Sequence, residues 1–300
     1  MGAGGLGGYL GARLAQAGCD VTFIARGAHL AAMRSSGLRV ESPQGDQSMA
    51  VQATDDPSSV GPVDYVFFCV KLWDSTPAAA HMRPLVGPTT TVISFQNGVR
   101  KDDLLRREFG DGAVMGGVAY IAAAVSEPGT IVQTGAIQRL IFGELDGTTL
   151  PRGEALLEAC RAAGIDAELH PDVTRAIWEK FVFLVGLSGA TTSTRASIGP
   201  IRENPRSREF LLDLMREVVA IGRARGVDLP PDYADQRLAF VDTLPPEMTS
   251  SMHHDLTHGH RLEVDELSGA VATMGTELGI ATPANRAVAA ILAPWANGSG

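Results

Sequence analysis

The first part of the chain alternates short apolar runs with segments of helical periodicity. Runs typical of buried strands lie at 19–25, 64–70 and 91–95. Between the first two, the pattern predicts a helix at 27–36 and then a polar stretch, 39–56, with room for a hairpin. Strands that alternate with helices in this way are typical of a parallel sheet covered by helices on both faces.

The pattern changes after residue 113. The apolar runs between 113 and 143 are short and are separated by glycine and Pro-Gly, which predicts an antiparallel extension of the sheet. A helix at 153–163 and a strand at 165–169 complete this part. Pro171 and an N-capping Asp172 then open a long helix, and everything beyond it has helical spacing. The later helices are expected at 205–225, 262–278 and 283–293.

A phosphate-binding glycine pattern, Gly2-x-Gly4-x-x-Gly7, stands at the first residues. In a dinucleotide-binding fold the first glycine allows a tight strand-to-helix turn and the second lets backbone amides approach the pyrophosphate. The third lets the helix pack closely on the strand. A short apolar strand is expected before Gly2, where only Met1 stands. Either the true start lies upstream, or the sheet lacks its central strand.

The residue at the end of the strand 19–25 indicates the nucleotide. NAD-binding proteins usually place Asp or Glu about 20 residues after the glycines, where it binds the ribose 2′-hydroxyl. Arg26 stands there instead, and a guanidinium favours a 2′-phosphate through charge-assisted hydrogen bonds. The sequence therefore favours NADP(H), and a solvated loop arginine is the alternative.

These features predict an α/β chain, with a Rossmann-type dinucleotide-binding domain followed by an all-helical C-terminal domain. Residues 1–169 form the NADP-binding domain, whose first strand is missing or truncated. Residues 170–300 form the helical substrate and catalytic domain. A chain of 300 residues with 45% hydrophobic content is long enough for two such cores.

The composition bears on the possible binding partners of the protein and on its cellular compartment. The net charge is −9 and no basic run occurs, which argues against nucleic acid or an anionic membrane as a partner. No apolar stretch is long enough for a membrane-spanning helix. Cys19, Cys69 and Cys160 lack the spacing of a disulfide framework or metal site. We expect a cytoplasmic protein with reduced thiols and leave a homodimer open.

Further motifs follow the glycine run 2–11 and Arg26: Val70-Lys71-Leu72-Trp73, Phe95-Gln96-Asn97-Gly98-Val99, Trp178-Glu179-Lys180, and Ser250-Ser251-Met252 with Glu263 twelve residues after Ser251. In this order and spacing they resemble the ketopantoate reductase (2-dehydropantoate 2-reductase) family over essentially the whole chain. The resemblance implies hydride transfer from NADPH to a 2-keto acid in a cleft between two domains. In that family the reaction turns ketopantoate into pantoate for pantothenate and coenzyme A biosynthesis.

The resemblance also implies roles for individual residues. It assigns the pyrophosphate to Gly2, Gly4, Gly5, Leu6 and Gly7, the 2′-phosphate to Arg26, and the nicotinamide half of the cofactor to Lys71 and Asn97. Lys180 falls on the family's catalytic lysine, Ser251 on a substrate-contacting serine, and Glu263 on a glutamate at the cofactor and active site. The substrate would contact Lys180, Asn97, Ser188 and Ser251.

Lys180 suits the chemistry independently of the resemblance. Reduction of a ketone needs a hydride on carbon and a proton on the developing alkoxide, so a general acid must stand within reach of that oxygen. A lysine ammonium stabilises the negative charge and then supplies the proton, once burial or neighbouring charge lowers its pKa. The alternative is a surface lysine. Against it, Lys180 is the only lysine after Lys101 and precedes an apolar run.

Two other site residues have competing structural interpretations. Glu263 is also explained as an exposed carboxylate at a helix start, where the helix dipole favours it. Asn97 is also explained as a turn residue, because Asn and Gly both tolerate positive φ.

The substrate side departs from the family pattern. The typical family helix carries asparagines four and eight residues after the lysine, and here those positions are Leu184 and Ser188. Leucine makes no hydrogen bond, although Thr191 and its neighbours or Arg195 could compensate. The chain is therefore expected to be a 2-keto acid reductase, most directly of ketopantoate. The alternatives are a paralogue acting on another 2-keto acid and a non-catalytic NADP(H) sensor.

A histidine cluster, His253, His254, His258 and His260 with Asp255, follows Ser251. His254 and His258 have the i, i+4 spacing that places two imidazoles on one helix face for zinc. No glutamate of the zinc-protease arrangement lies between them, and nicotinamide chemistry needs no metal. We expect structural or substrate-contacting histidines and no metal site, with zinc as the alternative.

Overall fold

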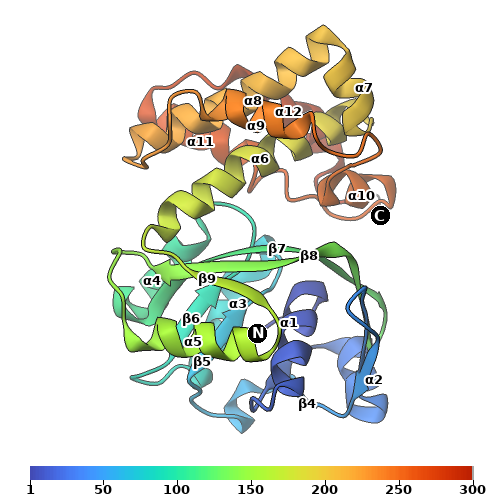
Figure 1. Ribbon diagram of the computed structural model, residues 1–300, viewed down its shortest axis with the longest axis vertical. Helices are drawn as coiled ribbons and strands as arrows, with labels where there is room; N and C mark the ends of the chain where they lie inside the picture. Colours follow the sequence, from blue (N-terminus) through green and yellow to red (C-terminus); the bar gives the residue numbers. More distant parts are fainter. Residues whose placement is uncertain (299–300) are drawn as a thin grey trace. The chain divides into compact units, whose positions relative to one another are not determined.

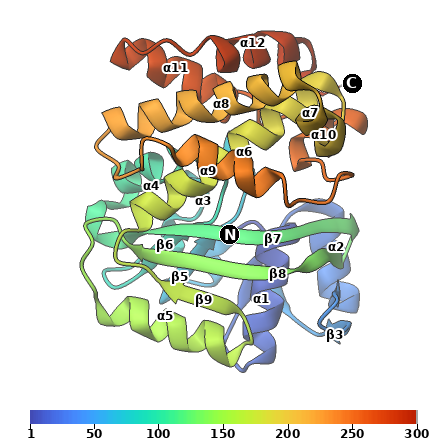
Figure 2. The same cartoon turned by 45° about the horizontal axis from the view of Figure 1, so that its top comes forward.

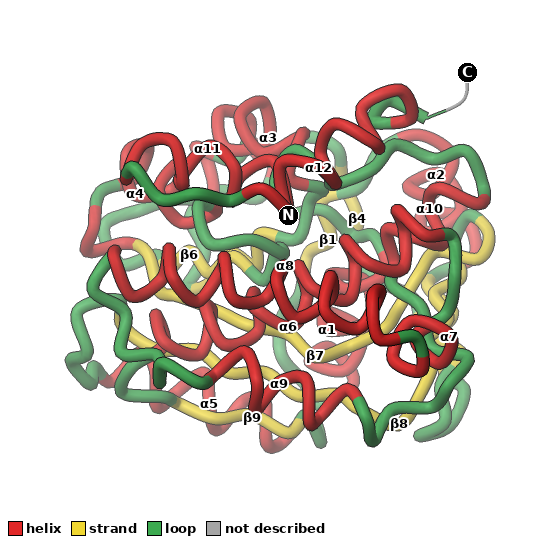
Figure 3. Tube along the Cα trace, turned by 90° about the horizontal axis from the view of Figure 1, so that it is seen from above, coloured by secondary structure: helices red, strands yellow, loops and turns green. Residues whose placement is uncertain are grey.

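The computed structural model describes residues 1–298. They form two compact units, of which the first is Met1–Ala176 and the second begins at Ile177. All strands of these residues belong to the first unit, and the second contains only helices and loops (Figures 1 and 3). The predicted fold class, a mixed α/β domain followed by a helical domain, is confirmed.

The main sheet has the strand order β3-β2-β8-β7-β6-β5, and β9 also pairs with β8. Strands β5, β6 and β7 are parallel, and β2 and β3 form the antiparallel hairpin expected within 39–56. The strands are β2 (Leu38–Glu41), β3 (Gln47–Met49), β5 (Tyr65–Phe68), β6 (Thr91–Ser94), β7 (Val114–Glu127), β8 (Thr130–Glu144) and β9 (Asp166–Leu169).

The antiparallel extension differs from the prediction in the length of its strands. Instead of several short runs, β7 and β8 form one long hairpin (Figure 2). Gly135 has φ +78° and lies where the register shifts, between the pairs Ala122–Thr134 and Ile121–Gln138. The glycine that suggested a strand end therefore marks a bulge inside a continuous strand.

Residues 1–3 occupy the place of the expected first strand. The Met1 nitrogen donates to Phe67 O (2.8 Å) and Cys69 N donates to Met1 O (2.9 Å). On the other side, the amides of Gly2 and Ala3 both donate to Ile24 O at 3.1 Å. These residues thus connect β5 to the parallel pair β1 (Thr22–Ile24) and β4 (Gln52–Thr54).

Helices cover both faces of the sheet, as the sequence predicts. One apolar cluster contains side chains of α1 (Gly5–Gln16), α2 (Gly27–Ser36) and α5 (Pro151–Ala162), and the other those of α3 (Ser75–His81) and α4 (Lys101–Phe109). Strand β6 contributes Ile93 to the first cluster and Val92 to the second. Alternation along the strand therefore divides the apolar side chains between two cores.

The second unit is a group of helices. Helix α6 (Val173–Thr194) begins in the first unit and continues into the second, which also contains α7 (Ile198–Glu203), α8 (Pro205–Ala224), α9 (Tyr233–Val241), α10 (Ser251–Thr257), α11 (Ser268–Leu278) and α12 (Pro283–Leu292). Asp172 Oδ1 accepts from Arg175 N at 2.9 Å, so the predicted cap of α6 is confirmed. Among the helices of residues 1–298, none combines the length and apolar composition of a membrane span.

The helix predicted at 262–278 begins six residues late, at Ser268. In the preceding segment Leu262 N donates to Ala296 O (2.9 Å), and residues 264–267 form turns. Leu262, Val264 and Leu267 are all buried. Their burial gave this segment an apolar pattern that resembles a helix face.

A buried ion pair begins α4. Lys101 Nζ donates to Ser94 O (2.7 Å) and lies 3.1 Å from Asp102 Oδ1, and the two side chains are 1% and 9% exposed. Burial lowers the pKa of Lys101 and raises that of Asp102, and the attraction between them opposes both shifts. The pair fastens the start of α4 to the end of β6.

We expect Lys101→Ala to lower the free energy of unfolding by about 3–5 kcal/mol, because the Asp102 carboxylate would stay buried without its cation. The double variant Lys101→Met/Asp102→Leu leaves no unpaired charge and should lose less. Urea denaturation of the three proteins measures both effects. A double variant at least as unstable as the single one would contradict this interpretation.

Candidate functional site

The glycines at 2, 4 and 7 occupy three different environments. Gly2 has φ +87°, and a Cβ there would lie 2.8 Å from Val70 Cγ1. A Cβ at Gly7 would overlap the carbonyl oxygen of Gly2, so the helix packs on the turn with no space for a side chain. At Gly4 a Cβ would meet no protein atom within 4 Å. The turn is thus closed on the protein side and open at Gly4.

The open side of the turn is the N-terminus of α1. Gly4 is the N-cap residue, no side chain caps the helix, and its first turn contains no acidic residue. The amides of Gly5, Leu6 and Gly7 point out of the first turn without intrahelical acceptors. Exposed amides and the helix dipole favour an anion at such a position.

Arg26 lies at the end of the neighbouring strand β1, as the N-cap residue of α2. Its side chain is 80% exposed, and Nη2 lies 3.0 Å from Asp74 Oδ2. The first turn of α2 also lacks acidic residues and a capping side chain. Arg26 therefore combines a solvent-accessible guanidinium with a helix N-terminus. Asp74, which no sequence motif indicated as a site residue, contacts it from the end of the short helix η2 (Leu72–Asp74).

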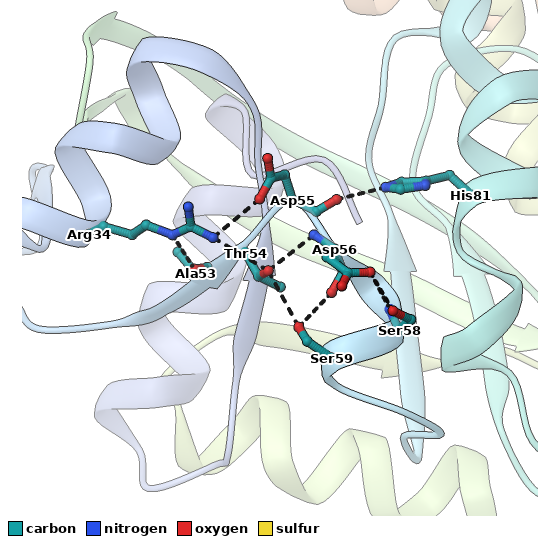
Figure 4. Close-up of polar contacts among 8 residues, drawn as sticks. All are labelled: Arg34, Ala53, Thr54, Asp55, Asp56, Ser58, Ser59 and His81. Carbon is teal, nitrogen blue, oxygen red and sulfur yellow. Dashed lines mark hydrogen bonds and ion pairs between the residues drawn. The ribbon is translucent and has the colours of Figure 1, made fainter.

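A polar network fixes the helices that follow Arg26 and Asp74 (Figure 4). From α2, Arg34 donates to Ala53 O (3.1 Å) and pairs with Asp55 Oδ1 (3.2 Å). At the end of α3, His81 Nε2 lies 2.8 Å from Asp55 O. Both helices are thereby held to the segment that follows β4.

Lys71 and Asn97 follow the carboxyl ends of β5 and β6, as predicted. Between them lies the buried side chain of Gln96, whose Nε2 donates to Val70 O and to Ser75 Oγ, each at 2.8 Å. Gln96 thus joins the segment that carries Lys71 to the one that carries Asn97. Gln96 belongs to the motif 95–99 noted in the sequence, but only its hydrogen bonds in the structure show that it connects these two segments.

In the second unit, Lys180, Leu184 and Ser188 share one face of α6, because four residues make about one helical turn. Lys180 and Leu184 are half-buried. Ser188 is fully buried, and its Oγ has no hydrogen-bond partner within residues 1–298. Other buried side-chain oxygens of residues 1–298, such as Thr91 Oγ1 and Ser268 Oγ, also lack a partner, so this feature alone does not mark a ligand site.

A buried group of hydroxyls lies one turn further along α6. Thr191 Oγ1 is 3.0 Å from Ser250 Oγ, and that oxygen also accepts from His253 N (3.0 Å) to cap α10. Ser251, the predicted substrate residue, is exposed at the first position of α10. Ser250 is therefore the structural serine of the pair, and Ser251 is accessible.

Glu263 is buried, with 6% exposure, in the irregular segment before α11. Its interpretation as an exposed carboxylate at a helix start is therefore wrong. Nearby, burial raises the pKa of Glu266, and the negative charges of Glu263 and Asp265 raise it further. A buried carboxylate needs a polar environment, which is consistent with a site residue.

Arg195, considered above as a carboxylate ligand, follows α6 with φ +54°. Its guanidinium carbon lies 5.2 Å from the ring centroid of Trp295, a cation–π contact. Ala196 N donates to Thr191 O, which completes a helix-ending turn usually made by glycine.

The histidines form a stacked group on the surface. Ring centroids of His254 and His258 are 4.0 Å apart, and those of His258 and His260 are 5.9 Å apart. Asp255 Oδ1 lies 3.4 Å from His260 Nδ1. Burial lowers the pKa of the neighbouring His253. Within residues 1–298, no group of three or more His, Cys, Asp or Glu has the geometry of a metal site.

Known proteins match the chain over nearly its whole length. The family model described as ketopantoate reductase PanE/ApbA matches residues 1–147, and its C-terminal counterpart matches residues 172–295. A 2-dehydropantoate 2-reductase of Mesorhizobium japonicum is 32% identical over 314 residues, covering 97% of this chain and 95% of the relative. The PanE/ApbA family ketopantoate reductase of Ralstonia eutropha JMP134 has a TM-score of 0.90 and 34% identity, covering 99% and 97% of the two chains.

The fold extends to more distant proteins. A D-mandelate dehydrogenase in a ternary structure with NADH and anilino(oxo)acetate has a TM-score of 0.89 at 18% identity, covering 98% of this chain and 96% of that one. At this level of identity the likeness concerns the fold alone.

The different environments of Gly4 and Gly7 predict different effects of adding a methyl group. Gly4→Ala should change the free energy of unfolding by less than about 1 kcal/mol, because the site is open and only the N-cap preference is lost. Gly7→Ala should cost about 1–3 kcal/mol or more, because its Cβ would overlap Gly2. Chemical denaturation of both variants checks this, and equal losses would contradict the geometry.

Proposed function

Because the chain belongs to the ketopantoate reductase family, a family of oxidoreductases, we propose that it uses NADPH to reduce a 2-keto acid to a 2-hydroxy acid. The most specific form of the proposal is reduction of ketopantoate to pantoate in pantothenate and coenzyme A biosynthesis, in the cytoplasm. The main structural support for this proposal is the glycine turn. A Cβ at Gly2 or Gly7 would lie too close to neighbouring protein atoms, whereas the space around Gly4 is open.

In this proposal residues 1–169 bind the cofactor. The amides of Gly5, Leu6 and Gly7 hold the pyrophosphate at the open N-terminus of α1, together with Gly2 and Gly4. Arg26 binds the 2′-phosphate, supported by its exposure and by the uncapped start of α2. The D-mandelate dehydrogenase structure contains NADH. Here Arg26 stands where NAD-binding proteins usually carry a carboxylate, which favours NADPH.

Residues 170–300 supply the acid and most substrate contacts. When bound, the nicotinamide supplies the hydride. Lys180 holds the keto oxygen, stabilises the charge that develops there and donates the proton. Lys71 and Asn97 orient the nicotinamide half of the cofactor, and Glu263 lies beside cofactor and substrate. Asn97, Ser188 and Ser251 bind the substrate with Lys180.

One observation favours a second candidate, a paralogous reductase of another 2-keto acid. Leu184 lies between Lys180 and Ser188 on α6, where the family pattern has an asparagine. An apolar side chain there favours a substrate with fewer polar groups than ketopantoate. The two candidates share the cofactor, the acid and the reaction, and differ only in the substrate.

Lys180→Ala should lower kcat by about 10²–10⁴-fold, because the alkoxide loses both its stabilising charge and its proton donor. The dissociation constant for NADPH should stay within about twofold, because Lys180 faces the substrate. Thr273→Ala, at an exposed position of α11, is the control. Steady-state NADPH oxidation and fluorescence titration provide the readouts. Unchanged turnover would exclude Lys180 as the acid, and NADPH binding without any turnover by the unmodified protein would indicate a sensor.

Leu184→Asn should raise kcat/KM for ketopantoate by about tenfold, the value of one added hydrogen bond. Pyruvate, which lacks the hydroxyl group, should gain little. Competition between these two substrates before and after the substitution measures the change. An equal gain for both substrates, or none for either, would show that position 184 does not select the substrate.

A further inference from the structure

The Arg26–Asp74 ion pair joins the two segments that flank the glycine turn. Gly2 and Ala3 donate to Ile24 O at the end of β1, and Cys69 beyond the end of β5 donates to Met1 O. Arg26 follows the first of these segments. Asp74, the last residue of the short helix η2 (Leu72–Asp74), follows the second. The guanidinium proposed for the 2′-phosphate therefore already has an acidic partner, 3.0 Å away.

We propose that Asp74 determines cofactor selectivity by lowering the preference for NADPH over NADH, an inference that rests on the proposed function. The 2′-phosphate must share Arg26 with the Asp74 carboxylate or displace it. A ribose 2′-hydroxyl, by contrast, can donate a hydrogen bond to that carboxylate, as it does to the acidic residue of NAD-binding proteins. The pair thus offers a cation to one cofactor and an acceptor to the other.

Electrostatics gives the direction of the effect. The 2′-phosphate carries a charge between about −1.5 and −2 at neutral pH, by analogy with phosphate esters on side chains, and Asp74 repels it. NADH lacks this group and meets no such repulsion. Because the two side chains are 80% and 34% exposed, water and salt screen the interaction. The effect is therefore several-fold rather than many orders of magnitude.

The segments on either side of the pair are held by other contacts. Gln96 binds Ser75 at the start of α3, and His81 at its end lies 2.8 Å from Asp55 O. On α2, Arg34 donates to Ala53 O. An exposed ion pair adds little to such a framework. The fold therefore does not depend on Asp74, which leaves its carboxylate available for selectivity.

The test is fluorescence titration of NADPH and NADH with the full chain and with Asp74→Asn, which removes the charge and keeps the shape. We expect the Kd for NADPH to fall about three- to tenfold. The Kd for NADH should stay the same or rise, because the ribose 2′-hydroxyl loses its charged acceptor. Asp74→Ser should act in the same direction. Asp111→Asn is the control, because it removes the same charge from another exposed ion pair, in which Arg106 Nε of α4 lies 2.7 Å from Asp111 Oδ1. It should alter neither Kd.

High salt provides a second readout. At 0.5 M salt, roughly the range in which surface charges are screened, the gain of Asp74→Asn for NADPH should shrink towards onefold. Equal shifts for both cofactors, or no shift for either, would overturn the role of Asp74. Failure of the unmodified chain to bind either cofactor would overturn the proposed function as well. Binding of both without reduction of any 2-keto acid would overturn the reaction, while the ratio of affinities would still decide the role of Asp74.

Discussion

The first unit depends on the close approach of helix α1 to the sheet, which glycines make possible. A Cβ at Gly5 would overlap the backbone of Ala123 in β7, and one at Gly11 would overlap the ring of Phe23 in β1. With Gly7 against Gly2, these contacts fix both the distance and the direction of the helix. Its N-terminus therefore opens at Gly4, and the proposed cofactor site follows from a packing constraint.

Cofactor choice and substrate choice are assigned to different parts of the chain. In the first unit, Arg26 after β1 and Asp74 at the end of η2 form an ion pair, and we propose that the preferred nucleotide depends on both charges. In the second unit, one face of α6 carries Lys180, Leu184 and Ser188, of which only the central residue is apolar.

Much of the fold and of the candidate site was predictable from local sequence patterns. Alternating apolar runs predicted the α/β unit, and the glycine spacing predicted the turn. The bulge at Gly135 and the irregular segment after Leu262 were misjudged, because each depends on pairing with a distant strand or segment. The contacts of Asp74 with Arg26 and of Gln96 with Val70 were missed for the same reason, since these partners are distant in the sequence. Sequence spacing locates strand ends but does not show which side chains meet there.

In the proposed reaction, hydride passes from the nicotinamide to the keto carbon of a 2-keto acid. The most direct test is mass spectrometry of the product formed from ketopantoate with NADPH deuterated at either position of C4. We predict that one of the two labelled cofactors, and only that one, delivers deuterium to C2 of the hydroxy acid. The proposed hydride transfer would be contradicted if neither labelled cofactor delivered deuterium to the product. It would also be contradicted if no product formed from ketopantoate or from any other 2-keto acid.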